Sequence, residues 1–243
     1  MNSRILTLGL STLTLGAVSL TAVSAQAATL SPSDCLGAEY DCTYSNPFFS
    51  LEASDGSGAA QLTRKSFSGY EGIGVATAGT TDIQDDPSWG EIDFDESLNV
   101  NLGRGTILES LDLGFLYRPG VNFDRVFETA KITAKLNDGS ILENIFSVTG
   151  SNTGSLSGLG SVSNISPSNP GGAGLYSLLN PFGNAVIKSF SVTAVDSGKN
   201  FSRQSWDSDF VVAQAQVADV PEPSIVLGLL GVGILGLRRR RAQ

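Results

Sequence analysis

The feature that most constrains this chain is an apolar residue at every second position, repeated over many short stretches. Successive side chains of a β-strand point to opposite faces of a sheet, so this alternation places one apolar face on a core and leaves the other in water. Helical spacing is absent from most of the region 28–219, apart from a short stretch near 121–130. The alternation therefore predicts an all-β fold. The clearest stretches are 98–102, 111–115, 132–136, 190–194 and 211–217.

The same region also contains patterns that predict a hairpin turn and the number of domains. The segment 137–140, Asn-Asp-Gly-Ser, lies between two alternating stretches, and Asp-Gly is typical of a hairpin turn because glycine accepts a positive φ. Residues 150–174 carry no charge and are rich in Gly, Ser and Asn, which is compatible with a linker between two domains. Apolar residues that recur within this segment favour instead a long loop with an irregular strand. We expect one domain, residues 28–219, folded as a β-sandwich or jelly roll.

Composition excludes several classes of function. The chain has no histidine, which removes Ser-His-Asp and Cys-His catalytic units and histidine-ligated metal sites. Two cysteines are too few for a four-cysteine zinc site or an iron–sulfur cluster. The formal net charge is −9, and the region 28–219 is near −13 once Arg4, the arginines at 238–241 and Glu222 are set aside. Because phosphate binding needs clustered Lys and Arg, we expect no nucleic-acid partner.

The N-terminus has the pattern of a secretory signal peptide. Arg4 supplies a positive charge, residues 5–23 are uncharged and rich in Leu, Val and Ala, and 25–27, Ala-Gln-Ala, is a small-x-small cleavage pattern. Ser and Thr within the apolar stretch argue against a retained anchor. We predict that signal peptidase removes residues 1–27 and that the mature chain begins at Ala28.

The C-terminus carries a second pattern. Pro221, Glu222 and Pro223 precede the segment 225–237, which contains only Ile, Val, Leu and Gly, and four arginines follow at 238–241. The prolines delay the start of any helix. The apolar helix after them would be about 20 Å long, against about 30 Å of bilayer hydrocarbon. We therefore expect a transient membrane anchor whose arginines stay in the cytoplasm.

Pro-Glu-Pro, a short apolar helix and a terminal arginine cluster together resemble the PEP-CTERM sorting signal of exported bacterial proteins. The resemblance implies that residues 220–243 are recognised by an exosortase, a membrane transpeptidase-like enzyme. It also implies transient insertion in the inner membrane, followed by delivery to the cell envelope, cell surface or extracellular matrix. By position, the recognition element would be Pro221, Glu222 and Pro223. The arginine cluster would be Arg238, Arg239, Arg240 and Arg241.

The region between the two ends is similar to a group of PEP-CTERM proteins whose β-sandwich carries three short motifs. These motifs are Gly90-Glu91-Ile92, Asn180-Pro181-Phe182-Gly183 and Ser208-Asp209-Phe210. The resemblance spans much of residues 70–217. It implies a shared β-sandwich and no particular activity.

Cys35 and Cys42 are the two cysteines of the chain, with six residues between them. In an exported protein a close pair of this kind is typical of a disulfide. The alternative is a redox-active pair, but such pairs usually have two residues between the cysteines. We predict a disulfide that holds the N-terminal segment in place.

An acidic segment, residues 82–96, holds seven acids and no base. Close carboxylates repel one another, and a Ca²⁺ ion would offset the repulsion by accepting several of their oxygens. The segment lacks the loop pattern of an EF-hand, and the alternative is a solvated acidic face on a strand that carries Ile92 and Phe94. No cofactor is required by either interpretation. The candidate ligands for a structural Ca²⁺ are Asp82, Asp85, Asp86 and Glu91.

Trp89 and Trp206 both lie among polar and acidic residues. Exposed aromatic side chains on a β-sandwich can stack on sugar rings while polar neighbours bind the hydroxyls. The alternative is a partly buried tryptophan at a sheet edge, which needs no ligand. Both are candidate carbohydrate-stacking residues.

These observations favour a non-catalytic, exported protein with a structural or adhesive role in the envelope or matrix. One alternative is a carbohydrate-binding module that recognises exopolysaccharide through Trp89 or Trp206. A further alternative is a polysaccharide-cleaving hydrolase that uses two acids of the segment 82–96. No recognisable hydrolase motif accompanies these acids, so we expect no enzymatic activity.

Overall fold

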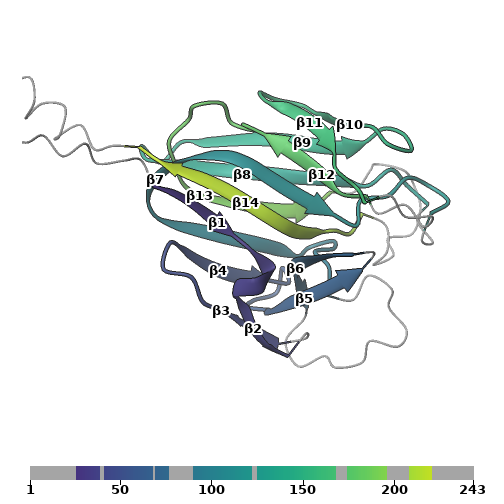
Figure 1. Ribbon diagram of the computed structural model, residues 1–243, viewed down its shortest axis with the longest axis horizontal. Helices are drawn as coiled ribbons and strands as arrows, with labels where there is room; N and C mark the ends of the chain where they lie inside the picture. Colours follow the sequence, from purple (N-terminus) through teal and green to yellow (C-terminus); the bar gives the residue numbers. More distant parts are fainter. Residues whose placement is uncertain are drawn as a thin grey trace, which may run out of the picture.

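The computed structural model describes residues 26–38, 41–67, 69–76, 90–121, 125–167, 174–195 and 208–220. This part of the chain is almost entirely antiparallel β-sheet, which confirms the all-β prediction (Figure 1). The sheet is curled, and its assignment as a sandwich or jelly roll stays a prediction. No helix within these ranges is long and apolar enough to cross a membrane. Residues 1–25 of the predicted signal peptide and the predicted C-terminal helix lie outside the described residues.

Fourteen strands and one 3-10 turn, η1 (Pro32–Asp34), are present in the described ranges. Twelve strands belong to one sheet with the main order β10-β9-β8-β13-β7-β14-β6-β5, while β2 (Cys35–Ala38) and β3 (Asp41–Tyr44) pair separately. The strands of the large sheet are β1 (Ala27–Leu30), β4 (Phe49–Ser54), β5 (Gln61–Phe67), β6 (Tyr70–Ala76), β7 (Ser97–Gly114), β8 (Thr129–Leu136), β9 (Ile141–Val148), β10 (Gly154–Leu156), β11 (Ser161–Asn164), β12 (Tyr176–Leu179), β13 (Ile187–Ala194) and β14 (Val211–Asp219).

Strand β7 is 18 residues long and organises the sheet. Its first part pairs with β4 on one side and β13 on the other, whereas its second part pairs with β12 and β14. Between these parts, Gly105 packs so closely that an added Cβ would lie 2.9 Å from Cγ1 of Val186. One continuous strand therefore joins two groups of strands, and the curled sheet runs through it.

The apolar face of β7 switches parity along its length. Even positions face the core up to Leu108, and odd positions face it from Leu111 onward. The switch coincides with a register shift in the pairing with β14, between Gln216 and Val217, which leaves Glu109 as an extra residue. A bulge of this kind changes which side chains point inward. It lets both halves of β7 contribute to one core.

Two local predictions are confirmed. The segment 137–140 is the turn between β8 and β9, with Gly139 at φ +88° and Ser140 hydrogen-bonded through its N–H to Asp138 Oδ1 at 2.9 Å. The uncharged segment 150–174 contributes the short strands β10 and β11. The predicted domain boundaries are not tested by these observations.

The two ends of the described region lie side by side. Strand β1 pairs with the last residues of β14, so that Ala27 is opposite Ala218 and Leu30 is opposite Ala215. The N–H of Asp219 donates to the carbonyl of Gln26 at 3.2 Å. The Asp219 carboxylate also forms an ion pair with Arg104 in β7.

The predicted disulfide between Cys35 and Cys42 is present and joins β2 to β3, with a Cα–Cα distance of 5.2 Å. Both cysteines are buried. The adjoining turn η1 is held by Asp34, whose Oδ2 accepts a hydrogen bond from Asn46 Nδ2 at 2.8 Å. The disulfide therefore fixes the N-terminal segment, as expected.

Replacing Cys35 and Cys42 together by Ser should destabilise the protein, because the cross-link restricts the unfolded chain. The chain-entropy model for a loop of this length gives a loss of about 2.5 kcal/mol. That loss corresponds to a fall in Tm of about 5–10 °C for a domain of this size. Thermal melting with and without reductant measures it. The wild type in reductant should match the variant, and a wild-type Tm unchanged by reductant would contradict the prediction.

Candidate functional site

Most of the residues that the sequence predicts to bind a ligand or to direct sorting lie outside the described residues. This holds for the candidate calcium ligands Asp82, Asp85 and Asp86. It also holds for the candidate sugar-stacking residues Trp89 and Trp206. The sorting residues Pro221, Glu222, Pro223, Arg238, Arg239, Arg240 and Arg241 lie outside as well. Among the candidates other than the cysteines, Glu91 is the one whose surroundings can be described.

Two of the short motifs, far apart in sequence, pair with each other. The N–H of Ile92 donates to the carbonyl of Phe210 at 2.6 Å, and the N–H of Phe210 donates to the carbonyl of Ile92 at 3.2 Å. Both side chains are fully buried. The Gly-Glu-Ile motif is therefore attached to the Ser-Asp-Phe motif at the start of β14. This bridge positions the backbone of Glu91.

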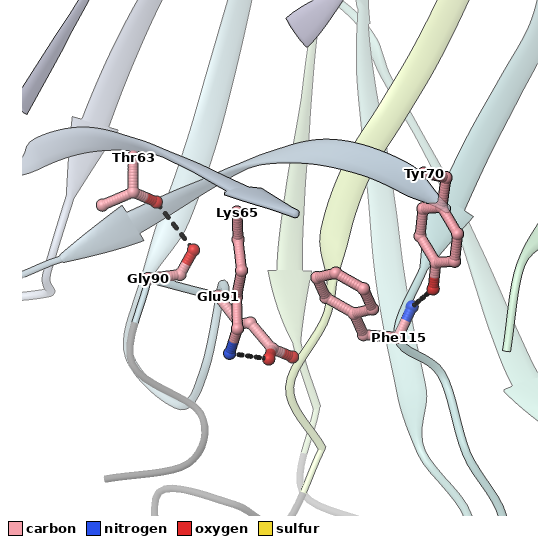
Figure 2. A network of polar contacts seen from close by, with 6 residues as sticks. All are labelled: Thr63, Lys65, Tyr70, Gly90, Glu91 and Phe115. Atoms are coloured by element: carbon pink, nitrogen blue, oxygen red, sulfur yellow. Dashed lines mark hydrogen bonds and ion pairs between the residues drawn. The ribbon is translucent and has the colours of Figure 1, made fainter. Parts of the chain in front are cut away.

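The carboxylate of Glu91 forms an ion pair with the ammonium group of Lys65 on β5 (Figure 2). The side chain of Glu91 is 8% exposed and that of Lys65 is 24% exposed, so water screens this pair less than it screens a surface pair. Lys65 Nζ also lies 5.7 Å from the ring centroid of Phe115, within the range of a cation–π contact. The ion pair thus joins β5 to the acidic segment 82–96, of which Glu91 is a member.

The backbone of Gly90 is contacted from both strands of the β5–β6 hairpin. Thr63 Oγ1 donates to the carbonyl of Gly90 at 2.6 Å, and Thr63 is buried (Figure 2). On β6, a Cβ added to Gly74 would lie 2.0 Å from the same carbonyl oxygen. Glycine is therefore required at position 74 for the hairpin to approach Gly90 this closely.

Tyr70 completes this group of contacts at the other end of the hairpin. Its hydroxyl oxygen accepts a hydrogen bond from the N–H of Phe115 at 2.7 Å, and the two rings lie 5.0 Å apart (Figure 2). Phe115 has φ +67°, a left-handed conformation that disfavours large side chains. Burial is the main cause that raises the pKa of Tyr70, with a smaller contribution from Tyr117. Tyr70 therefore stays protonated at neutral pH. We call Thr63, Lys65, Tyr70, Gly90, Glu91 and Phe115 the polar clamp.

A second buried carboxylate, Glu128, lies close enough to the clamp to raise the pKa of Tyr70 further. Glu128 is 0% exposed, and its Oε2 accepts a hydrogen bond from the N–H of Tyr117. The carbonyl of Glu128 accepts from the N–H of Val148 at 2.9 Å. Sequence reasoning did not nominate this residue. Its one signal is its position as the single acid among the largely apolar residues 126–130.

The third short motif, at 180–183, also has a structural role. The N–H of Asn180 donates to the carbonyl of Glu109 at the β7 bulge, at 2.7 Å, and the N–H of Gly183 donates to the carbonyl of Asn180 at 2.9 Å. Asn144 Nδ2 donates to the carbonyl of Pro181. Phe182 packs into the core. This turn therefore secures the bulge on which the two halves of β7 depend.

The polar groups of the clamp are already engaged in contacts with one another. The Glu91 carboxylate faces a lysine ammonium, and a cation bound there would have to compete with it. Within the described ranges, no group of three or more His, Cys, Asp or Glu side chains could hold a metal ion. The predicted calcium site, most of whose ligands lie elsewhere in the chain, stays a prediction.

Comparison with protein-family models identifies the C-terminal end. The model described as the PEP-CTERM protein-sorting motif matches residues 219–242. The chain carries a PEP-CTERM sorting signal. Such a signal implies an exported, envelope-associated protein that an exosortase-type enzyme sorts. The match begins at Asp219, the last residue of β14, so the PEP-CTERM signal follows the sheet directly. A comparison with curated proteins finds no match.

Breaking the Lys65–Glu91 pair in this PEP-CTERM protein should destabilise the fold more than removing both charges. Lys65→Met leaves a buried carboxylate without its lysine partner and should cost about 2–4 kcal/mol. The double variant Lys65→Met with Glu91→Leu should recover part of that loss, since no uncompensated charge remains. Urea unfolding of both single variants and the double variant gives the coupling energy. Strictly additive losses would show that the pair is not coupled.

Asp112 on β7 provides a pH-dependent prediction. Burial raises the pKa of Asp112, although a hydrogen bond from Ser177 lowers it in part. Its Oδ1 is buried and has no hydrogen-bond partner in the described region. The folded state therefore favours the protonated acid, so stability is lost as pH rises through the folded pKa. Asp112→Asn should raise Tm at neutral pH, and the gain should vanish below the ordinary value of 3.8.

Asp138 is the matched control for this experiment. Hydrogen bonds from Ser140 lower the pKa of this exposed carboxyl, which is the opposite direction. Asp138→Asn should therefore give no gain in Tm at neutral pH. Melting curves of both variants across the acidic range make the comparison. A gain for Asp112→Asn that persists at the lowest pH would show that ionisation of Asp112 is not its cause.

Proposed function

We propose that residues 28–219 form a non-catalytic module with a structural or adhesive role in the cell envelope or extracellular matrix. The observation that carries this proposal is the PEP-CTERM motif at 219–242, joined directly to the last strand of a β-rich fold that also holds a disulfide. The signal implies export, and a disulfide suits an oxidising compartment. Export and retention outside the cell are what such a role requires.

The buried polar groups support a structural role. Lys65 with Glu91, Thr63 with Gly90, and Tyr70 with Phe115 each join segments that are distant in sequence. A catalytic acid or base must be able to exchange a proton with a substrate. The clamp instead directs its charged and hydroxyl groups toward one another. The absence of histidine from the sequence agrees with this proposal.

A carbohydrate-binding module is the second candidate function. The observation that favours it is a set of uncharged hydroxyl and amide side chains paired across β7 and β13, since antiparallel sheets can turn one face to water and present a ligand surface there. Binding of exopolysaccharide would itself be a form of adhesion, so the two candidates are compatible. The third possibility, a polysaccharide-cleaving hydrolase, would depend on acids of the segment 82–96 and is the weakest.

The sorting signal and the role of the protein are tested together in the source cell. Replacing Pro221, Glu222 and Pro223 by Ala should prevent sorting and reduce the surface-retained protein severalfold, whereas Ser224→Ala should not. Deleting the gene should weaken cell aggregation or matrix cohesion, and restoring the wild-type gene should reverse the effect. Fractionation with immunoblotting and an aggregation assay provide the measurements. Unchanged cohesion after deletion would remove the structural or adhesive role, and release of reducing sugar by the protein would overturn the non-catalytic proposal.

A further inference from the structure

The outer face at the centre of the sheet is a regular array of short polar side chains. On β7 and β13 the residues that face away from the core pair across the strands as Asn101 with Ser189, Asn99 with Ser191, and Ser97 with Thr193. We call these six residues the polar grid. Their neighbours along each strand, such as Val100 and Val192, are buried in the core. The backbone beneath the grid is therefore held rigidly.

The array continues onto the strands beside it. Strand β4 places Ser50 next to Asn101 and Ser54 next to Ser97, and β8 places Thr133 next to Ser191. Three of the six positions that flank the grid are charged: Glu52 lies next to Asn99, Lys131 next to Thr193 and Lys135 next to Ser189. The grid is uncharged within a region whose net charge is near −13.

The grid is suited to hydrogen bonding with a ligand that presents a repeating surface. Each Asn offers two N–H donors and a carbonyl acceptor, and each hydroxyl both donates and accepts. Neighbouring strands are about 4.8 Å apart and alternate residues about 6.8 Å apart, so these groups form a lattice. A hydrogen bond from Asn99 Nδ2 to Ser97 Oγ, at 3.4 Å, links two of them along β7.

The chemistry of the grid excludes several kinds of partner. Nucleic acid, an anionic membrane or a charged peptide would need a cluster of complementary charge, which these six residues lack and which the one acid and two lysines beside them do not form. A lipid chain or an apolar protein surface would need apolar side chains, which they also lack. The outward face of the four strands β4, β7, β13 and β8 spans about 14 Å by 14 Å, or about 200 Å². Stable protein partners bury about 800 Å² each, so this area is small for a protein and adequate for a few sugar units.

We propose that the polar grid binds an uncharged polysaccharide. This inference rests on the proposed adhesive role and names the surface that would perform it. The ligand is a neutral, polyhydroxylated polymer laid across β7 and β13. Its hydroxyl groups exchange hydrogen bonds with Asn99, Asn101 and the hydroxyl side chains beside them. Because the six grid residues are uncharged and the ligand is neutral, retention on the polymer should depend little on salt.

The test is a pull-down of the exported, full-length gene product on insoluble cellulose, cross-linked dextran and starch, with the anionic polymer alginate as a comparison. We expect retention on at least one neutral polymer, at low and high salt, and little retention on alginate. The double variant Asn99→Ala with Asn101→Ala should lose at least tenfold in retention. Asn184→Ala changes an exposed asparagine outside the grid and should bind as the wild type does.

Thermal melting establishes that each variant is folded. If the double Asn variant is unstable, Ser191→Gln replaces it, because the longer side chain disrupts the flat surface without adding charge. Full retention in a folded grid variant, or loss of retention only in Trp89→Ala or Trp206→Ala, would overturn the proposal. Failure to bind any neutral polymer would overturn it as well. The gene deletion tests the adhesive role separately, so failure of the grid and failure of that role are distinguishable.

Discussion

The fold depends on the requirement that a buried strand satisfy its backbone hydrogen bonds on both sides. Strand β7 runs for 18 residues through the middle of the sheet and needs partners along its whole length. It meets this requirement by exchanging one pair of neighbours, β4 and β13, for another, β12 and β14. The bulge at Glu109 then returns the apolar side chains to the common core. The turn at 180–183 binds to that bulge and fixes it in place.

The polar clamp attaches the β5–β6 hairpin to the rest of the sheet. Strand β6 pairs with β14 at a single position, Ile73 with Val212, which is a weak connection by itself. The Lys65–Glu91 ion pair and the Tyr70–Phe115 hydrogen bond add two further contacts between the hairpin and the rest of the structure. Buried polar contacts are directional and costly to break, so they specify one position of the hairpin where apolar packing alone would allow several.

The sequence predicted those features that depend on near neighbours. Alternation indicated the strands around Leu98, Ile132 and Phe190 because a period of two is visible within five residues. The β8–β9 turn and the disulfide followed from short spacings as well. The pairing of Ile92 with Phe210 joins residues more than a hundred positions apart, and nothing in either motif names its partner. For the same reason the contact of the Glu91 carboxylate with Lys65 could not be predicted from the sequence, and the role of Glu91 as a calcium ligand stays a prediction.

The two predicted processing segments adjoin the first and last strands of the sheet, β1 and β14. The predicted cut before Ala28 falls inside β1 and would leave three residues, 28–30, paired with β14. Leu30, which is fully buried, anchors that remnant in the core. At the other end, β14 reaches only to Asp219, where the sorting motif begins, and the Arg104 ion pair holds this last residue. Every described strand thus lies between the predicted signal peptide and the matched sorting motif, except for Ala27 at the start of β1 and Asp219 at the end of β14. Removal of the signal peptide would cost the contacts of Gln26 and Ala27 with β14, but the pairing of residues 28–30 with β14 and the Arg104–Asp219 ion pair come from residues that remain, so an intact sheet is compatible with processing.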